Sequence, residues 1–218
     1  MALAIVTLLH VLVFAYWLGG DVGAFYASTI LTDTKQPAAA RIAAAKVLNN
    51  VDMAPRTALI LAFPTGYALA ATKNWISVPG WTIAAVAVAG LAWLALAWTV
   101  HLRHGPGSAL PRRIDLLIRW VALAGLLAIA LTGKLGETPL MLFLRLKCAI
   151  LATAIGAGLL IRVTLAPFGP AFGKMLKDGP SPETDAVIDR ALAQSRPVVL
   201  ALWALLLAAA FLGLATPV

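Results

Sequence analysis

Residues 7–26 read Thr7-Leu-Leu-His10-Val-Leu-Val-Phe-Ala-Tyr-Trp17-Leu-Gly-Gly20-Asp21-Val-Gly-Ala-Phe-Tyr26. The stretch is apolar, and its length approaches the roughly 20 residues that a helix needs to cross a bilayer. It also carries a histidine, His10, roughly two turns into the apolar segment. Ionisable side chains inside membrane helices are costly, so they are candidates for function by default. The stretch therefore predicts a first membrane helix that carries a functional imidazole.

The composition of the whole chain indicates the same class of protein. Of its 218 residues, 61% are hydrophobic, whereas soluble domains are about 45–50% apolar. The apolar runs are rich in Ala and Leu and lack strand-like alternation, which favours helices over barrel strands. We therefore predict an all-α, polytopic transmembrane bundle, one domain over 1–218, with about six spans at 3–31, 56–73, 79–101, 114–133, 138–163 and 196–215.

Two further segments read as helices on the membrane surface, at 37–49 and 181–194. Pro37 suits the first turn of the former. Ser181 and Thr184 are cap candidates for the latter, which has acidic residues in its first turn.

Basic residues predict the orientation of the chain in the membrane. Lys and Arg gather on cytoplasmic loops of membrane proteins. Here they are scattered along loops rather than striped on a face, so the net charge of +8 does not indicate a nucleic-acid partner. The links after the first, third and fifth spans carry most of them: Lys35, Arg41, Lys46, Arg56, Arg103, Arg112, Arg113, Arg162, Lys174, Lys177, Arg190 and Arg196. We therefore expect both termini outside, in the periplasm, and a bacterial inner-membrane protein whose partner is the lipid bilayer.

This topology places two ionisable groups at one depth. His10 lies about 10 Å below the outer surface and Lys147 about 12 Å, at about 1.5 Å per helical residue. The imidazole is either an axial ligand or proton carrier, or it makes an interhelical hydrogen bond. The lysine is either a buried base or amine ligand, or it reaches the outer surface together with Arg145.

Charged residues near the cytoplasmic side offer a second candidate site. Asp21 lies low on the first span, Arg56 opens the second, and Asp115 and Arg119 have i,i+4 spacing on the fourth. A buried charge needs a partner, so we expect Asp21 to pair with Arg56 or Arg119. Such a group is either a proton path or a structural ion pair between helices.

Other residues have a functional and a structural interpretation. Gly19, Gly20 and Gly23 would admit a neighbouring helix or a flat cofactor. Trp17 and Tyr26 would line a cofactor or anchor the helix at the interface. His101 and His104 read as an interfacial pair rather than a metal site. The single cysteine, Cys148, excludes an intrachain disulfide and a Cys-based metal site.

Several of these residues carry a resemblance to known membrane proteins. The run His10-x6-Trp17-x2-Gly20, followed by Phe25-Tyr26, resembles the first helix of the HemJ-type protoporphyrinogen oxidases and the wider CopD-like family. Pro55-Arg56 to Pro64-x-Gly66 resembles their second helix, and Arg145-Leu-Lys147 their lysine helix. The tail from Lys177 to Pro217 is also similar. The third and fourth spans are additional in this chain, and the Tyr-His that follows the lysine helix in that family is absent.

The resemblance implies a haem-dependent membrane oxidoreductase. It implies haem b with its iron on His10, and Lys147 as catalytic residue, either second ligand or proton acceptor. Arg145 or Lys134 would contact the propionates, and Trp17, Gly20 and Tyr26 would complete the cofactor site. Electrons would pass to a quinone or to a membrane redox partner.

Two other functions remain open from the sequence. The glycine-rich first helix and the long link 164–195 suit a non-catalytic anchor subunit of a respiratory-type complex, or a homo-oligomer. A CopD-like transporter would use Asp21, Arg56 and Arg119 as a relay, although no inverted repeat is visible.

Overall fold

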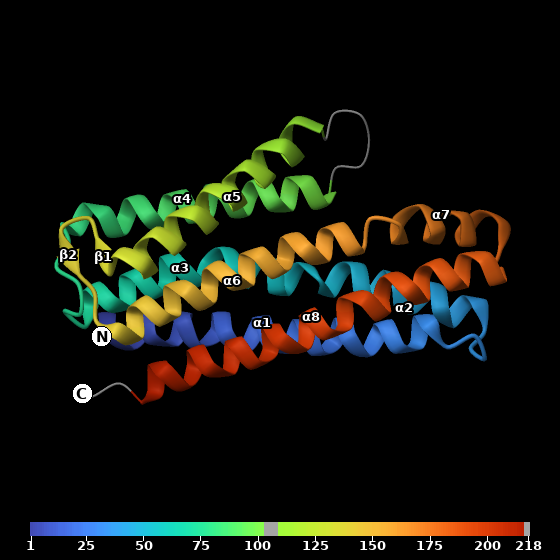
Figure 1. Cartoon of the computed structure of the whole chain (residues 1–218), viewed down its shortest axis with the longest axis horizontal. Helices are drawn as coiled ribbons and strands as arrows, with labels where there is room; N and C mark the ends of the chain where they lie inside the picture. The colour runs from blue at the N-terminus through green and yellow to red at the C-terminus, as the bar shows by residue number, and fades with distance from the viewer. Residues whose placement is uncertain (103–108, 216–218) are drawn as a thin grey trace.

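Long helices make up most of the chain in the computed structural model, which describes residues 1–102 and 109–215 (Figure 1). The fold is all-α, as predicted. A short hairpin of two-residue strands joins two of the helices. The elements are α1 (Ala2–Thr32), α2 (Ala38–Val51), α3 (Met53–Thr72), α4 (Gly80–Leu102), α5 (Ala109–Thr132), β1 (Lys134–Leu135), β2 (Thr138–Pro139), α6 (Leu142–Thr164), α7 (Phe168–Asp178) and α8 (Pro182–Leu214).

Among the described residues, five helices are long and apolar enough to cross a membrane: α1, α4, α5, α6 and α8. The helix α3, which we expected as a further span, does not reach the same hydropathy because it contains Arg56, Pro64 and Tyr67. It packs against α1, α4 and α6. A helix enclosed by other helices can carry polar residues that a lipid-facing helix cannot.

The helices lie in layers along one long axis (Figure 1). The helices α1 and α8 lie at one side, α4 and α5 at the other, and α3 and α6 lie between them. The first residue of α1 and the last residue of α8 lie at the same end as β1 and β2. The opposite end holds α2 and α7, and we call it the basic end because Lys35, Arg41, Lys46, Lys174 and Lys177 lie there.

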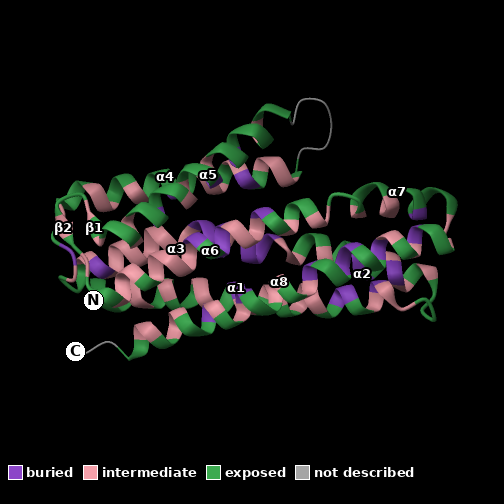
Figure 2. Cartoon of the chain, in the orientation of Figure 1, coloured by how far each residue is buried: buried purple, intermediate pink, exposed green. Residues whose placement is uncertain are grey.

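The bundle has two separate apolar cores, seen as two groups of buried residues in Figure 2. The larger core joins α1, α3, α4, α5, α6 and α8 around residues such as Trp17, Ile60 and Ile155. The smaller core lies at the basic end, where Leu31, Met175 and Ile188 bring together α1, α2, α7 and α8. At about 1.5 Å per residue, α1 and α8 exceed the roughly 30 Å hydrocarbon core, so their ends project to form this second core.

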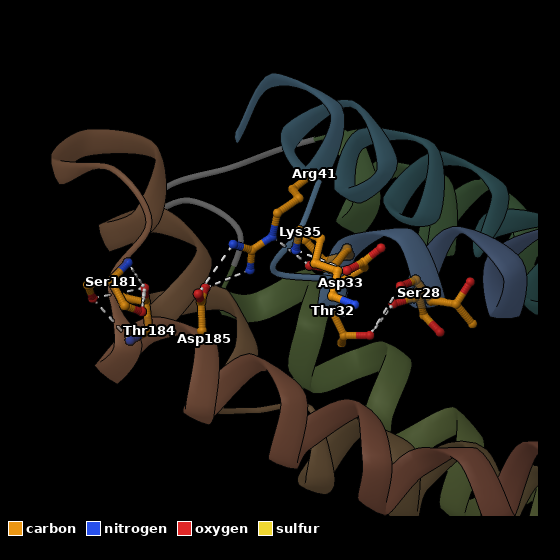
Figure 3. A network of polar contacts seen from close by, with 10 residues as sticks. Ser28, Thr32, Asp33, Lys35, Arg41, Ser181, Thr184 and Asp185 are labelled. Atoms are coloured by element: carbon orange, nitrogen blue, oxygen red, sulfur yellow. Dashed lines mark hydrogen bonds and ion pairs between the residues drawn. The ribbon is translucent and has the colours of Figure 1, made fainter. Parts of the chain in front are cut away.

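An arginine fixes the smaller core (Figure 3). The buried Arg41 of α2 donates from Nε to Leu31 O at 2.9 Å and forms an ion pair with Asp185 of α8 at 2.6 Å. Nearby, Ser181 caps α8 and forms a capping box with Thr184, as the sequence indicated. These contacts tie the start of α8 to the end of α1.

Four local predictions were wrong or incomplete. The segment 181–194 is not a separate surface helix, because α8 continues through Pro197 to Leu214. Two contacts hold the helix just before this proline: Ser195 Oγ lies 3.0 Å from Thr164 Oγ1, and Arg196 donates to Thr32 Oγ1 at 3.3 Å. The helix α7 was missed, and α6 begins at Leu142 rather than 138 because residues 138–139 pair with 134–135. Pro37 is the N-cap of α2 and lies one residue before its first turn.

The glycines of α1 differ sharply in their surroundings. A Cβ on Gly20 would lie 2.6 Å from Ala54 Cβ and 2.9 Å from Pro55 Cδ, so this glycine lets α1 and α3 approach. A Cβ on Gly23 would meet Val51 Cγ1 at 3.3 Å, and a Cβ on Gly19 would meet nothing within 4 Å. Helix packing, the structural interpretation of these glycines, thus applies to Gly20 in particular.

We expect Gly20→Ala to lower the free energy of unfolding by about 1–3 kcal/mol, because the added methyl group overpacks the α1–α3 contact. The adjacent Gly19→Ala is the matched control. It should leave stability unchanged or raise it by up to about 1 kcal/mol through helix propensity. Thermal unfolding in detergent measures both. Equal melting temperatures for the two variants would contradict this packing.

Candidate functional site

The site begins at His10, which α1 directs toward α3. Its Nδ1 lies 2.8 Å from Thr65 Oγ1, so the interhelical hydrogen bond that was the structural interpretation of this histidine is formed. A Cβ on Gly66 would lie 3.2 Å from His10 Cε1, so the absence of a side chain there makes room for the ring. Pro64 precedes these two residues and lies inside α3. The sequence around this proline therefore shapes the surface on which the imidazole rests.

The hydrogen bonds of Thr65 are compatible with a neutral His10 whose proton is on Nδ1. The threonine hydroxyl has one hydrogen, which it donates to Leu61 O at 2.7 Å, one turn back on its own helix. When the hydroxyl donates in this way, its oxygen accepts from His10 Nδ1–H. This tautomer leaves the lone pair on Nε2, which is the state in which a neutral imidazole binds a metal.

Lys147 enters the same part of the bundle from α6. No hydrogen bond joins Lys147 to His10 among the described residues, and the lysine acts on the His10 ring through its charge. Its Nζ would be only 2.7 Å from a Cβ on Gly213, near the end of α8. His10 thus rests on α3 and Lys147 rests on α8, and both lie toward the end of the bundle where α1 begins and α8 ends.

The other residues expected around the cofactor are spread along the bundle. Trp17 is buried in the larger core, seven residues and thus two turns beyond His10 on α1. Gly20 contacts α3, and Tyr26, with 68% of its surface exposed, lies about 24 Å further along α1 than His10. Arg145 donates to Ala130 O at 3.1 Å and Leu131 O at 3.4 Å, at the end of α5. Lys134 lies in β1.

The expected pairing of Asp21 with Arg56 or Arg119 is not formed. Arg56 pairs with Asp52 one turn back, and Arg119 pairs with Asp115 at 2.9 Å. The Oδ2 of Asp21 is buried and has no hydrogen-bond partner among the described residues. Each arginine takes the carboxylate four residues away on its own chain segment, because that partner is already in place when the helix forms.

Asp115 is the centre of a larger polar cluster that joins three helices. It accepts from Arg119 Nε at 2.9 Å, from Arg162 Nη2 of α6 at 3.0 Å and from Trp93 Nε1 of α4 at 3.0 Å. The Asp115 side chain is 1% exposed. The i,i+4 spacing would have allowed the Asp115–Arg119 pair to be recognised, although we assigned Arg119 or Arg56 to Asp21; no sequence signal connected Trp93 or Arg162 with Asp115.

The described residues contain no group of three or more His, Cys, Asp or Glu side chains that could hold a metal ion by themselves. A haem iron needs only one or two protein ligands.

His101 lies edge-on to Trp98, with ring centroids 6.0 Å apart. Arg103, His104 and Pro217 lie outside the described residues.

Comparison with protein-family models, with curated proteins and with solved structures finds no match to this chain. The resemblance to the HemJ-type and CopD-like proteins therefore stays a prediction, carried by the short motifs around His10, Pro64 and Lys147.

Proposed function

We propose that the chain is a multi-pass membrane protein that binds haem b and transfers electrons, with His10 as the axial ligand of the iron. The observation that supports the proposal most is the hydrogen bond of His10 Nδ1 to Thr65. Histidines that bind metals almost always donate their second ring N–H to a protein acceptor, which fixes the tautomer and raises the basicity of the ligating nitrogen. The donor chemistry of His10 therefore fits a haem iron.

The proposal includes six membrane crossings, with α3 as the crossing that the others enclose. The start of α1 and the end of α8 lie at the same end of the bundle, as expected for a chain that crosses the membrane an even number of times. The distribution of Lys and Arg favours the basic end as the cytoplasmic side of a bacterial inner membrane. On this topology His10 and Lys147 lie in the outer half of the bilayer.

A bound haem would supply one-electron redox chemistry to the site. Thr65 would hold the His10 ring in its ligating tautomer, and Gly66 would leave space beside the ring. Lys147, in an apolar part of α6, would accept or release the proton that accompanies electron transfer. The electron partner in this proposal is a quinone or a second membrane redox protein.

Replacing the hydrogen-bond acceptor of His10 tests the proposal without removing the ligand. We expect Thr65→Val to weaken haem affinity about 10–100-fold, the usual cost of losing a partner of a metal-bound histidine. The measurement is a titration of the purified apoprotein with haem, followed by the Soret absorption.

Thr57→Val is the matched control on the same helix, because the Thr57 hydroxyl has no hydrogen-bond partner among the described residues. It should bind haem as the wild-type chain does. Equal affinities of the Thr65 and Thr57 variants would show that the threonine does not support a ligating imidazole.

A further inference from the structure

A cavity lies on the side of the bundle away from α1, between α3, α4, α5 and α6. Its volume is about 670 Å³. The lining side chains are apolar, with Phe63, Leu96, Leu126 and Ile155 among them, and Trp93 is the one that carries a polar group. A lining of this kind offers almost no hydrogen-bond partner to water and therefore favours apolar ligands.

The cavity is open toward the lipid phase. Ala89 and Ala92 on α4, and Val121 and Gly125 on α5, line it and are exposed. Along α4 the lining runs from Val86 to Leu96, a rise of about 15 Å. This is about half of the roughly 30 Å hydrocarbon core, which is the depth of one leaflet. The lining ends six residues, about 9 Å, before the end of α4 at Leu102, so an acyl chain that enters from that side fills the cavity with its distal part.

The polar cluster around Asp115 lies next to this cavity. Trp93 lines the cavity and donates its indole N–H to Asp115. On α6, Arg162 is seven residues beyond the lining residue Ile155, so both lie on one helix face, about 10 Å apart. The cluster contains two guanidinium groups and one carboxylate, and thus keeps one positive charge uncompensated within it.

Arg162 is the member of the cluster that can meet a headgroup. Its side chain is 39% exposed, whereas the Arg119 side chain is 7% exposed. Arg162 gives one N–H to Asp115 at 3.0 Å, and a guanidinium has five N–H donors in a fork that suits phosphate. Its place near the basic end of α6 is also the level at which headgroups of the adjacent leaflet begin.

We propose that this cavity binds one acyl chain of an anionic phospholipid whose phosphate pairs with Arg162. The apolar lining selects a hydrocarbon chain, and the excess positive charge selects an anionic headgroup. A polar ring system such as a quinone headgroup finds no free donor in the cavity, because the Trp93 N–H is already bonded to Asp115. The site uses other residues than His10 and is independent of haem binding.

Filling the cavity tests the chain-binding part. In Gly125→Leu the new side chain enters open space, since a Cβ there meets nothing within 4 Å. Gly158→Leu on α6 is the matched control: its Cβ also meets nothing within 4 Å, and Gly158 does not line the cavity. The full-length chain is delipidated in detergent, incubated with phosphatidylglycerol, and analysed by native mass spectrometry.

We expect the wild-type chain and Gly158→Leu to retain one phosphatidylglycerol that Gly125→Leu loses, with at least a tenfold fall in bound lipid. Equal retention by the Gly125 and Gly158 variants would overturn the proposal. Haem content of the same samples is read separately, so failure of the lipid site is distinguishable from failure of the haem site.

Removing the charge tests headgroup selection. The wild-type chain should prefer phosphatidylglycerol over phosphatidylcholine of the same chain length. Arg162→Gln should reduce this preference by about tenfold, since a charged hydrogen bond is lost. Arg190→Gln, an exposed arginine of α8, is the control and should keep the preference. A wild-type chain without headgroup preference, or equal preferences in the two arginine variants, would overturn the assignment of Arg162.

Discussion

Asp115→Ala is expected to lower the free energy of unfolding by about 3–5 kcal/mol, because it leaves the buried Arg119 without its counter-charge. The carboxylate also accepts from Arg162 and from Trp93, so the substitution removes the contact that joins α4, α5 and α6. Thermal or denaturant unfolding in detergent measures the effect.

Asp52→Ala is the control for this prediction. It breaks the ion pair with Arg56, which has the same i,i+4 spacing but side chains that are 37% and 43% exposed. Exposed pairs contribute about 0–1 kcal/mol, so this variant should unfold close to the wild type. If the two aspartate variants lose the same stability, burial does not distinguish the two pairs and the role given to Asp115 is wrong.

The fold was predictable where the sequence of a single helix is enough to identify that helix. Apolar runs of membrane length gave the long helices α1, α4, α5, α6 and α8, and Ser181 with Thr184 marked the start of α8. The prediction failed where tertiary contacts decide. We expected a surface helix at 181–194 and a separate span from 196, but α8 continues through Pro197. Ser195 and Arg196 contact α6 and α1 just before this proline.

The helix α7 was missed for a related reason. Its sequence is short and of mixed polarity, and its apolar residues Phe172 and Met175 gain a partner only in the smaller core, against α1, α2 and α8. Helices of this length depend on packing rather than on intrinsic propensity. The projecting ends of α1 and α8 supply that packing.

The candidate site was predictable only in part. The i,i+4 spacing of Asp115 and Arg119 was visible in the sequence, but we assigned Arg119 or Arg56 to Asp21, so the ion pair of Arg119 with Asp115 was not predicted. Contacts between helices depend on the rotation of each helix about its axis and on the angles at which the helices cross. The distribution of Lys and Arg and the rise per helical residue determine neither. Thr65, Trp93 and Arg162 were therefore not recognised as partners of His10 and Asp115, and the pairing expected for Asp21 was wrong.

The positions of the charges also bear on the relay that a transporter would need. Arg56 is bound to Asp52 at the start of α3, and Arg119 is held in the cluster of Asp115. Among the described residues, Asp21 forms no ion pair with Arg56 or with Arg119. These three residues thus belong to separate contacts, which favours structural roles for Arg56 and Arg119.

His10→Ala is expected to abolish haem binding, the largest functional effect of any variant, because it removes the proposed ligand of the iron. The lipid site and the Asp115 cluster should stay intact in this variant. Arg119→Lys is a control at a distance from His10, within the cluster on α5. It should change stability but leave haem content per folded chain unaltered.

The visible absorption spectrum of the full-length chain, purified from haem-replete cells and recorded oxidised and reduced, tests haem ligation most directly. We predict a Soret band and reduced b-type bands in the wild-type chain, and their loss in a folded His10→Ala variant. A folded wild-type chain without colour, or a His10→Ala variant with the same bands, would contradict the role of this histidine.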